Sequence, residues 1–281
     1  MDLRKLRLDM LDAAIARAQP NVCLPPHLPP PPESGRLIVL ACGKAGATMA
    51  EAVEQHYLDG GLIDPARMVG ICVTRHGYGR PLRRVRCVEA GHPVPDRAGL
   101  EATAETLELA RSAKADDLAL VLVSGGGSAN WTAPAEGLSI EDKQGLTRAL
   151  LKSGAPIGDI NTVRKHLSQI KGGRLAAALA PARSLSLIIS DVPGDDPSFI
   201  ASGPTAPDHT TAEDALAILA RWRIAAPEPV ERTLRSKAGE TPAPDDPCFV
   251  LAALRVVARP ADSLAAAADI ARAAGFDARL L

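Results

Sequence analysis

The stretch Asp117–Trp131, DLALVLVSGGGSANW, contains the clearest structural signal in the chain. Its first part, residues 118–123, is a run of six apolar residues that is too short for a helical pattern and is followed by glycines. Such a run is typical of a strand that is buried on both faces of a parallel sheet. The strand passes directly into the loop SGGGS. We therefore expect a central strand that ends in a glycine-rich loop.

This loop is a candidate anion-binding site. Consecutive glycines permit a positive φ and a close approach of backbone to ligand, so that several N–H groups can converge on one anion. Loops at the carboxyl ends of strands bind phosphate in this way in open α/β sheets. The alternative is a flexible turn, because GGGS matches neither GxGxxG nor GxxxxGK followed by Ser or Thr. The candidate residues are Ser124, Gly125, Gly126, Gly127 and Ser128.

Strand-like and helix-like segments alternate along the chain on both sides of this stretch. Strands are predicted at 36–42, 68–73, 85–88, 118–123, 185–190 and 248–258, and helices at 3–18, 47–56, 100–114, 140–153, 159–167, 212–221 and 261–274. This alternation indicates an α/β fold, namely a doubly wound, mainly parallel, Rossmann-like sheet with helices on both faces.

Several polar residues directly follow predicted strands. Lys44, with Gly43 before it, follows the first strand, His76 follows the second and His92 the third. Ser128 follows the central strand, and Asp191, with Asp195 after it, follows the strand at 185–190. The carboxyl ends of parallel strands meet at one edge of the sheet, so we expect these residues to form one site. A glycine cradle, a lysine, and carboxylates that serve as base or Mg²⁺ ligands suit phosphoryl transfer. The alternatives are a solvated lysine, turn-forming aspartates, and a histidine that only satisfies backbone groups.

Composition excludes several classes of protein. The net charge is −1 and only 2% of residues are aromatic, which argues against a nucleic-acid or membrane surface. The five cysteines are widely spaced and contain no CxxC, so we expect reduced thiols rather than a disulfide framework. The charged N-terminus contains no apolar signal region, and no apolar run approaches membrane-spanning length. We therefore expect a cytoplasmic protein, for which a homodimer is one assembly left open.

A proline-rich stretch, 227–247, marks a candidate domain boundary. It divides the chain into a predicted α/β domain at 1–245 and the beginning of a further region at 246–281. The final residues, 276–281, resemble the first residues of a new strand. We therefore expect that the chain ends inside a second domain.

Seven motifs between Leu37 and Thr205 match a known enzyme family. They are ACGKAG (41–46), VTRHGYG (73–79), EAGHPVPD (89–96), SGGGSA (124–129), APAEGLSIEDKQ (133–144), SGAPIGDINTVRKHLSQIKGGRLA (153–176) and ISDVPGDDPSFIASGPT (189–205). With these motifs the chain resembles the type II glycerate kinases, which are glycerate 2-kinases with an N-terminal DUF4147 domain and a C-terminal MOFRL domain. Some members carry the older label hydroxypyruvate reductase. The resemblance implies that 246–281 is the beginning of a truncated MOFRL-type region.

The resemblance implies ATP- and Mg²⁺-dependent phosphorylation of D-glycerate to 2-phosphoglycerate. By the same resemblance, Lys44 stabilises the transferring phosphoryl group and Asp191 acts as base or metal ligand. The loop at 124–128, with Gly43 and His92, would bind phosphate or substrate. Arg164 and Lys165 would contact anionic groups, although a solvated helix face is the usual explanation for such charges. Asp191 and Asp195 are the candidate Mg²⁺ ligands.

Two other functions stay open. A hydroxypyruvate reductase that uses NAD(P)H would need GxGxxG after the first strand, and the turn at 42–46, CGKAG, lacks that pattern. A non-catalytic module that binds a sugar acid could use the same glycine loop as an anion site.

Overall fold

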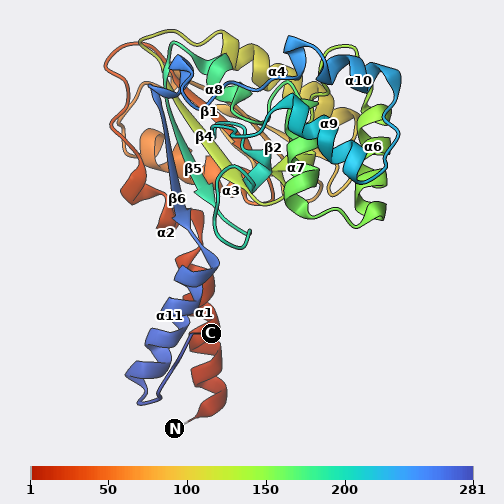
Figure 1. Cartoon of the computed structure of the whole chain (residues 1–281). Coiled ribbons are helices and arrows are strands. Elements are labelled where there is room, and N and C mark those ends of the chain that lie inside the picture. Colours follow the sequence, from red (N-terminus) through yellow and green to blue (C-terminus); the bar gives the residue numbers. More distant parts are fainter. Residues whose placement is uncertain (1, 281) are drawn as a thin grey trace.

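The computed structural model describes residues 2–280, and its central element is a six-stranded parallel sheet (Figure 1). The strand order is β3-β2-β1-β4-β5-β6, and every neighbouring pair is parallel. This arrangement confirms the predicted α/β fold. The strands are β1 (Leu37–Cys42), β2 (Met68–Arg75), β3 (Val85–Ala90), β4 (Leu118–Ser124), β5 (Arg183–Ile189) and β6 (Ala252–Ala258).

The topological switch point of the sheet, where the strand order reverses, lies between β1 and β4. The chain adds β2 and β3 on one side of β1, and then crosses to the other side to add β4, β5 and β6. In the register of β1, Cys42 lies opposite Val73 of β2 and Val123 of β4, so the carboxyl ends of the three strands are aligned. Such a reversal is the place where open α/β sheets bind ligands.

Both faces of the sheet are covered by helices, which explains why β1 and residues 118–123 of β4 are apolar. Alternate residues of β1 belong to different cores. Leu37 and Val39 pack with α2 (Pro20–Cys23) and α3 (Gly46–Glu54), whereas Ile38 and Leu40 pack with α4 (Arg97–Arg111) and α8 (Arg174–Leu179). The predicted doubly wound arrangement is therefore present.

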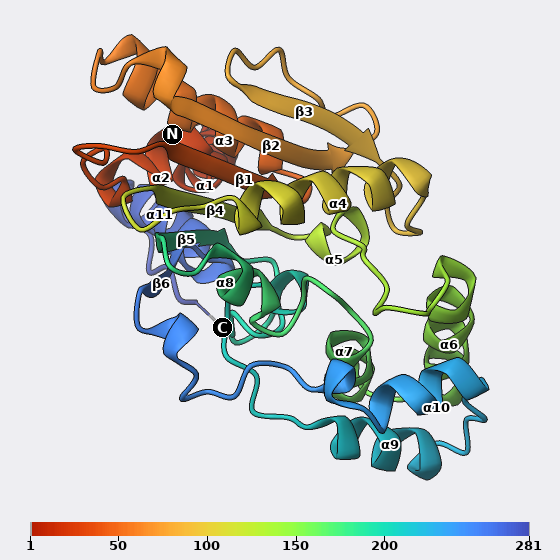
Figure 2. The same cartoon turned by 90° about the horizontal axis from the view of Figure 1, so that it is seen from above.

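Four helices form a separate group beside the sheet, which we call the helical lobe (Figure 2). They are α6 (Ile140–Ser153), α7 (Ile157–His166), α9 (Ala212–Arg221) and α10 (Glu228–Leu234). The lobe has its own apolar core, which includes Leu150 of α6 and Val163 of α7. Ser139 and Asp142 form a capping box at the start of α6. The stretch predicted as a boundary contains α10, whose side chains extend this core.

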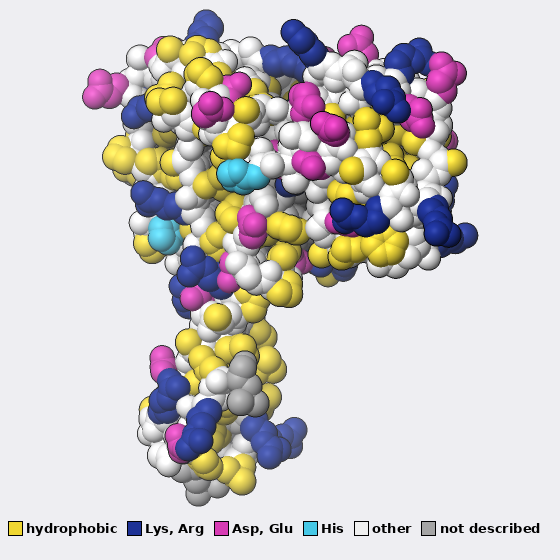
Figure 3. Space-filling model, viewed as in Figure 1, with side chains coloured by type: hydrophobic (Ala, Val, Ile, Leu, Met, Phe, Trp, Pro, Cys, Tyr) yellow, Lys and Arg dark blue, Asp and Glu magenta, His cyan; other side chains and the backbone are white. Residues whose placement is uncertain are grey.

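The N-terminal helix α1 (Leu3–Arg17) packs along α11 (Pro260–Ala273), and the two helices project from the body next to β6 (Figure 1). Apolar side chains lie exposed along this arm, as Figure 3 shows. The strand expected at 276–281 is not formed in residues 276–280. The chain instead turns after Gly275, and Arg272 donates to the Ala278 carbonyl oxygen at 3.0 Å. None of the described helices is long and apolar enough to cross a bilayer.

Candidate functional site

The loops that follow β1 and β4 are hydrogen-bonded to each other at the reversal of strand order. The Lys44 amide donates to the Gly125 carbonyl oxygen at 2.8 Å, and the Ala45 amide donates to Ser124 Oγ at 3.0 Å. Gly43 has a φ of 98°, and a Cβ at this position would lie 2.4 Å from the Ser124 carbonyl oxygen. Gly43 and Ser124 therefore position the two loops, and the buried Ser124 hydroxyl faces backbone rather than ligand.

Lys44 and Asp191 meet at this edge, as their positions after β1 and β5 predict. Lys44 Nζ lies 3.4 Å from Asp191 Oδ2, and both side chains are about half exposed, at 45% and 49%. An exposed pair of this kind contributes little to stability, on the order of 0–1 kcal/mol. Either partner can therefore turn towards a charged ligand at small cost.

The three glycines of the loop are required by close packing. A Cβ on Gly125 would lie 1.8 Å from Asp191 Oδ2, and a Cβ on Gly127 would lie 2.7 Å from Cys42 Sγ. Gly126 has a φ of 88°, and its Cβ would lie 2.9 Å from His92 Nε2. The loop is therefore a closely packed element rather than a free turn. It joins the Lys44–Asp191 pair on one side to His92 on the other.

A cavity of about 410 Å³ opens beside Gly126, between the sheet edge and the helical lobe. Helix α6 forms one wall of the cavity. The α6 residues that line it recur every three or four positions, so they lie on one face of the helix. No Asp or Glu side chain is among the described residues that line the cavity. Its polar lining consists mainly of His92, Ser128, Lys143, Gln144, Thr147, Arg148, Arg164 and Lys171.

The cations of this cavity lie in an environment that disfavours positive charge. Lys171 is buried, and its Nζ donates to the carbonyl oxygens of Ser128 at 3.0 Å and Trp131 at 2.8 Å. Burial and the nearby Lys143 hold the pKa of Lys171 well below its usual range. Burial likewise lowers the pKa of Arg164, and burial together with Lys44 lowers that of His92. An anionic ligand would relieve this concentration of like charge.

Lys165 lies outside this site, although its neighbour Arg164 lines the cavity. Successive residues of a helix point about 100° apart, so the two side chains leave α7 in different directions. Lys165 is buried, and its Nζ is 3.2 Å from Asp208 Oδ1. The structure thus pairs this lysine with a carboxylate of the protein itself.

The remaining predicted residues have identifiable partners. Ser128 Oγ lies 2.8 Å from Ser202 Oγ, so the two hydroxyls are hydrogen-bonded to each other. Asp195 has a φ of 53°, its Oδ2 is 3.9 Å from Arg259, and its Oδ1 is buried without a hydrogen-bond partner in the described chain. Within residues 2–280 there is no cluster of three or more His, Cys, Asp or Glu side chains suited to a metal ion.

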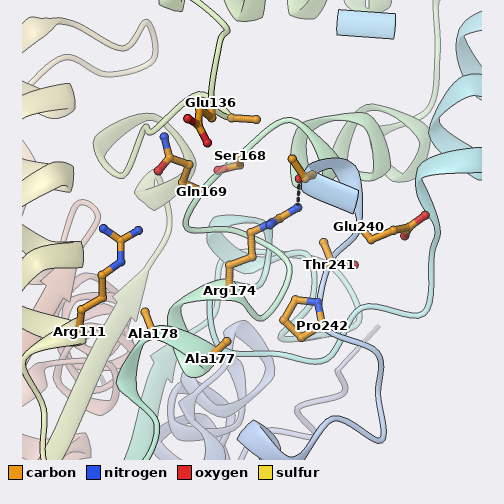
Figure 4. Close-up of a pocket in the computed structure, with 12 residues that line it drawn as sticks. Arg111, Glu136, Ser168, Gln169, Arg174, Ala177, Ala178, Glu240, Thr241 and Pro242 are labelled. Carbon is orange, nitrogen blue, oxygen red and sulfur yellow. Dashed lines mark hydrogen bonds between the residues drawn. The ribbon is translucent and has the colours of Figure 1, made fainter. Parts of the chain in front are cut away.

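A second cavity, of about 490 Å³, shares no lining residue with the first and is shown in Figure 4. Arg174 is in it and donates to the Ala238 carbonyl oxygen at 2.7 Å. Glu136 and Glu240 also line this cavity, so its charge is mixed. It contains none of the residues that follow strands, and we therefore place the candidate site at the first cavity.

Lys143, Arg148 and Lys171 are cations of the cavity that the sequence did not place in the site. Lys143 follows the capping box of α6 and resembles an ordinary solvated lysine in sequence. Lys171 lies within the motif at 153–176, where the sequence does not distinguish it from the neighbouring basic residues. Only the packing of the helical lobe against the sheet edge brings both to the cavity.

A parallel sheet with packed loops at the reversal of strand order, beside a cation-lined cavity, defines an α/β protein built to bind a small anionic ligand. A family profile described as "Domain of unknown function (DUF4147)" matches residues 6–235. The chain belongs to this family, and the resemblance noted in the sequence is confirmed.

Relatives carry two kinds of name. The chain is 45% identical over 213 residues to a glycerate 2-kinase of Pyrococcus horikoshii, which covers 74% of this chain and 46% of that protein. It is 44% identical over 273 residues to an Agrobacterium vitis protein provisionally named as a hydroxypyruvate reductase, covering 97% of this chain and 60% of that protein. The crystal structure of a glycerate kinase from Thermotoga maritima superposes with a TM-score of 0.87 at 38% identity, covering 99% of this chain and 64% of that chain. The chain thus spans about half to two thirds of these relatives' lengths.

Proposed function

We propose that this chain carries the phosphate-binding and acceptor-binding parts of an ATP-dependent glycerate 2-kinase, which converts D-glycerate to 2-phosphoglycerate. The observation that carries the proposal is the position of Lys44 beside the packed glycine loop, next to a cavity lined by cations. A kinase must neutralise charge on the transferring phosphoryl group and must also bind an anionic acceptor. The names of the Pyrococcus and Thermotoga relatives support this reading.

In this proposal Lys44 turns from Asp191 to the transferring phosphoryl group, and the released carboxylate accepts the proton of the acceptor hydroxyl. Lys44 and Asp191 lie within ion-pair distance of each other, so both side chains can contact the same reacting groups. Gly126 lies at the same edge and is only partly buried, so its backbone would be the part of the loop that approaches a phosphate oxygen.

The residues present fit a nucleotide with Mg²⁺. Mg²⁺ is usually held by one or two carboxylates together with substrate phosphates, and does not need a complete cage of protein ligands. The buried Oδ1 of Asp195 has no partner in the described chain, so Asp195 would hold the ion, and the accessible Asp191 would join it only where another group serves as the base. ATP supplies the phosphoryl group, and the bound ion would neutralise its oxygens.

The Agrobacterium relative's name favours a second candidate, reduction of hydroxypyruvate with NAD(P)H. The first βα turn does not support it. The turn CGKAG at 42–46 lacks the GxGxxG pattern, and Gly43 packs against the Ser124 backbone instead. We therefore favour the kinase.

The kinase is tested by ³¹P NMR of D-glycerate, MgATP and the purified protein, in the full length that its gene encodes. We expect a 2-phosphoglycerate signal that grows with time as ATP is consumed. NADH oxidation with hydroxypyruvate is followed in parallel. If only the second assay responds, the kinase is excluded in favour of the reductase.

Gly125→Ala should lower kcat/KM for D-glycerate on the order of tenfold without unfolding the protein, because displaced reacting groups lose catalytic efficiency. The new Cβ would overlap Asp191 Oδ2, and the half-exposed carboxylate can move aside. Steady-state kinetics and a thermal melt measure the two effects. The matched control is Gly145→Ala in α6, where a Cβ meets no atom within 4 Å. Equal values of kcat/KM for the two variants would show that the reaction does not depend on the position of the Asp191 carboxylate.

A further inference from the structure

Lys143 has an unsatisfied charge. It lies in the first turns of α6 and lines the 410 Å³ cavity, and its Nζ is shielded from solvent without a hydrogen-bond partner among residues 2–280. A buried ammonium group without a partner is costly, and proteins almost always pair such a group. The geometry therefore leaves room for a negatively charged partner that is not part of the described chain.

Every charged or titratable group that shares the cavity with Lys143 is cationic when protonated. Arg164 reaches it from α7, Arg148 from α6 itself, Lys171 from the segment after α7, and His92 from the loop after β3. Lys171 is already bound to two carbonyl oxygens, so its donors are largely used. Of the remaining cations, Lys143 and Arg164 are the two drawn from water by burial, so they gain most from an anion.

The other lining side chains indicate what kind of anion fits. Val94, Ile140 and Leu151 contribute apolar surface to the same cavity. A cavity lined by both cations and apolar groups suits a small organic acid better than free phosphate. It is also separated by Gly126 from the Lys44–Asp191 pair, where the phosphate groups of a nucleotide are expected.

We propose that Lys143, together with Arg164, binds the carboxylate of the acceptor, and that the enzyme thereby selects 2-hydroxy acids. This inference rests on the proposed kinase for the identity of the reaction. The subsite itself depends only on the cavity and its cations.

The subsite has a consequence for protons. Burial, and after it the charge of Arg164, lowers the pKa of Lys143 to about 7 in the free protein. A carboxylate beside the ammonium raises that pKa again, so above pH 7 binding takes up a proton. The affinity for the carboxylate is therefore highest below pH 7. It falls as the pH rises above 7, by about tenfold per pH unit as long as Lys143 remains protonated in the complex.

The test is isothermal titration calorimetry of the full-length protein with D-glycerate at pH 8, without nucleotide, in two buffers of different ionisation enthalpy. We expect uptake of on the order of one proton per ligand. Lys143→Gln should weaken binding roughly 10- to 100-fold, as expected for one charge-assisted hydrogen bond, and should abolish proton uptake. Lys143→Arg, which stays charged, should bind without proton uptake. Lys152→Gln, on the exposed side of the same helix, is the matched control.

The outcomes separate this subsite from the kinase. Wild-type affinity and proton uptake in Lys143→Gln would overturn the subsite, even if the protein phosphorylates glycerate. If the wild type binds L-lactate or another 2-hydroxy acid through Lys143 but phosphorylates no glycerate, the kinase fails and the subsite stands. Titration with inorganic phosphate completes the test. If Lys143→Gln weakens the binding of phosphate but not that of glycerate, Lys143 is a phosphate ligand and the proposed carboxylate subsite is overturned.

Discussion

Lys44→Ala should lower kcat for D-glycerate phosphorylation at least ~100-fold, as expected for the loss of an electrostatic group at the reacting centre. The ammonium lies beside the glycine loop and is half exposed, so it can reach the transferring phosphoryl group. Its only described ionic partner is Asp191 at 3.4 Å, and loss of such an exposed pair costs on the order of 1 kcal/mol or less. We therefore expect the melting temperature to change little. Single-turnover kinetics measure the chemical step directly.

The control for this variant is Lys152→Ala, which removes an exposed lysine from α6 and should leave kcat unchanged. Asp191→Ala is the informative companion, because it removes the proposed base and leaves Lys44 in place. Both variants should lose activity, and the double variant should lose less than the product of the two effects, since the residues act as one unit. Near-normal kcat in Lys44→Ala would remove this lysine from the mechanism.

The fold could be predicted because its signals are local. The apolar run of β4 has no polar position, which only a strand covered on both faces permits, and its carboxyl end carries the glycines. The rule that parallel strands share a carboxyl edge then correctly placed Lys44 beside Asp191, 147 residues away. The predicted helix at 212–221 has the bounds of α9, and the structure shows a capping box of Thr211 and Asp214 at its start.

The cavity could not be predicted because it is formed between two separately packed bodies. The orientation of α7 depends on the core of the helical lobe, to which Ile160, Val163 and Leu167 belong. Both sides of this helix are buried, so the sequence does not show which of Arg164 and Lys165 reaches the cavity. Lys143 was missed for a related reason, since an exposed and a buried lysine look alike when the opposing surface is unknown.

Asp208→Ala should lower the free energy of unfolding by about 3–5 kcal/mol, the usual cost of leaving a buried charge without its partner. Asp208 is almost fully buried, and its Oδ1 lies 3.2 Å from Lys165 Nζ and 2.8 Å from Thr210 Oγ1. His166 Nε2 lies 3.7 Å from the other carboxylate oxygen. Removing this carboxylate strands the Lys165 ammonium in a site without water access. Urea unfolding followed by circular dichroism measures the loss.

Asp245→Ala is the control, because this aspartate is exposed and its removal should change stability by less than about 0.5 kcal/mol. The double variant Lys165→Met with Asp208→Ala should regain part of the lost stability, because no charge is then buried alone. A small effect of Asp208→Ala would mean that Lys165 has another anionic partner, such as the ligand, and would return it to the site. The expected large effect makes Lys165 a structural residue that fixes α7, and with it the position from which Arg164 reaches the cavity.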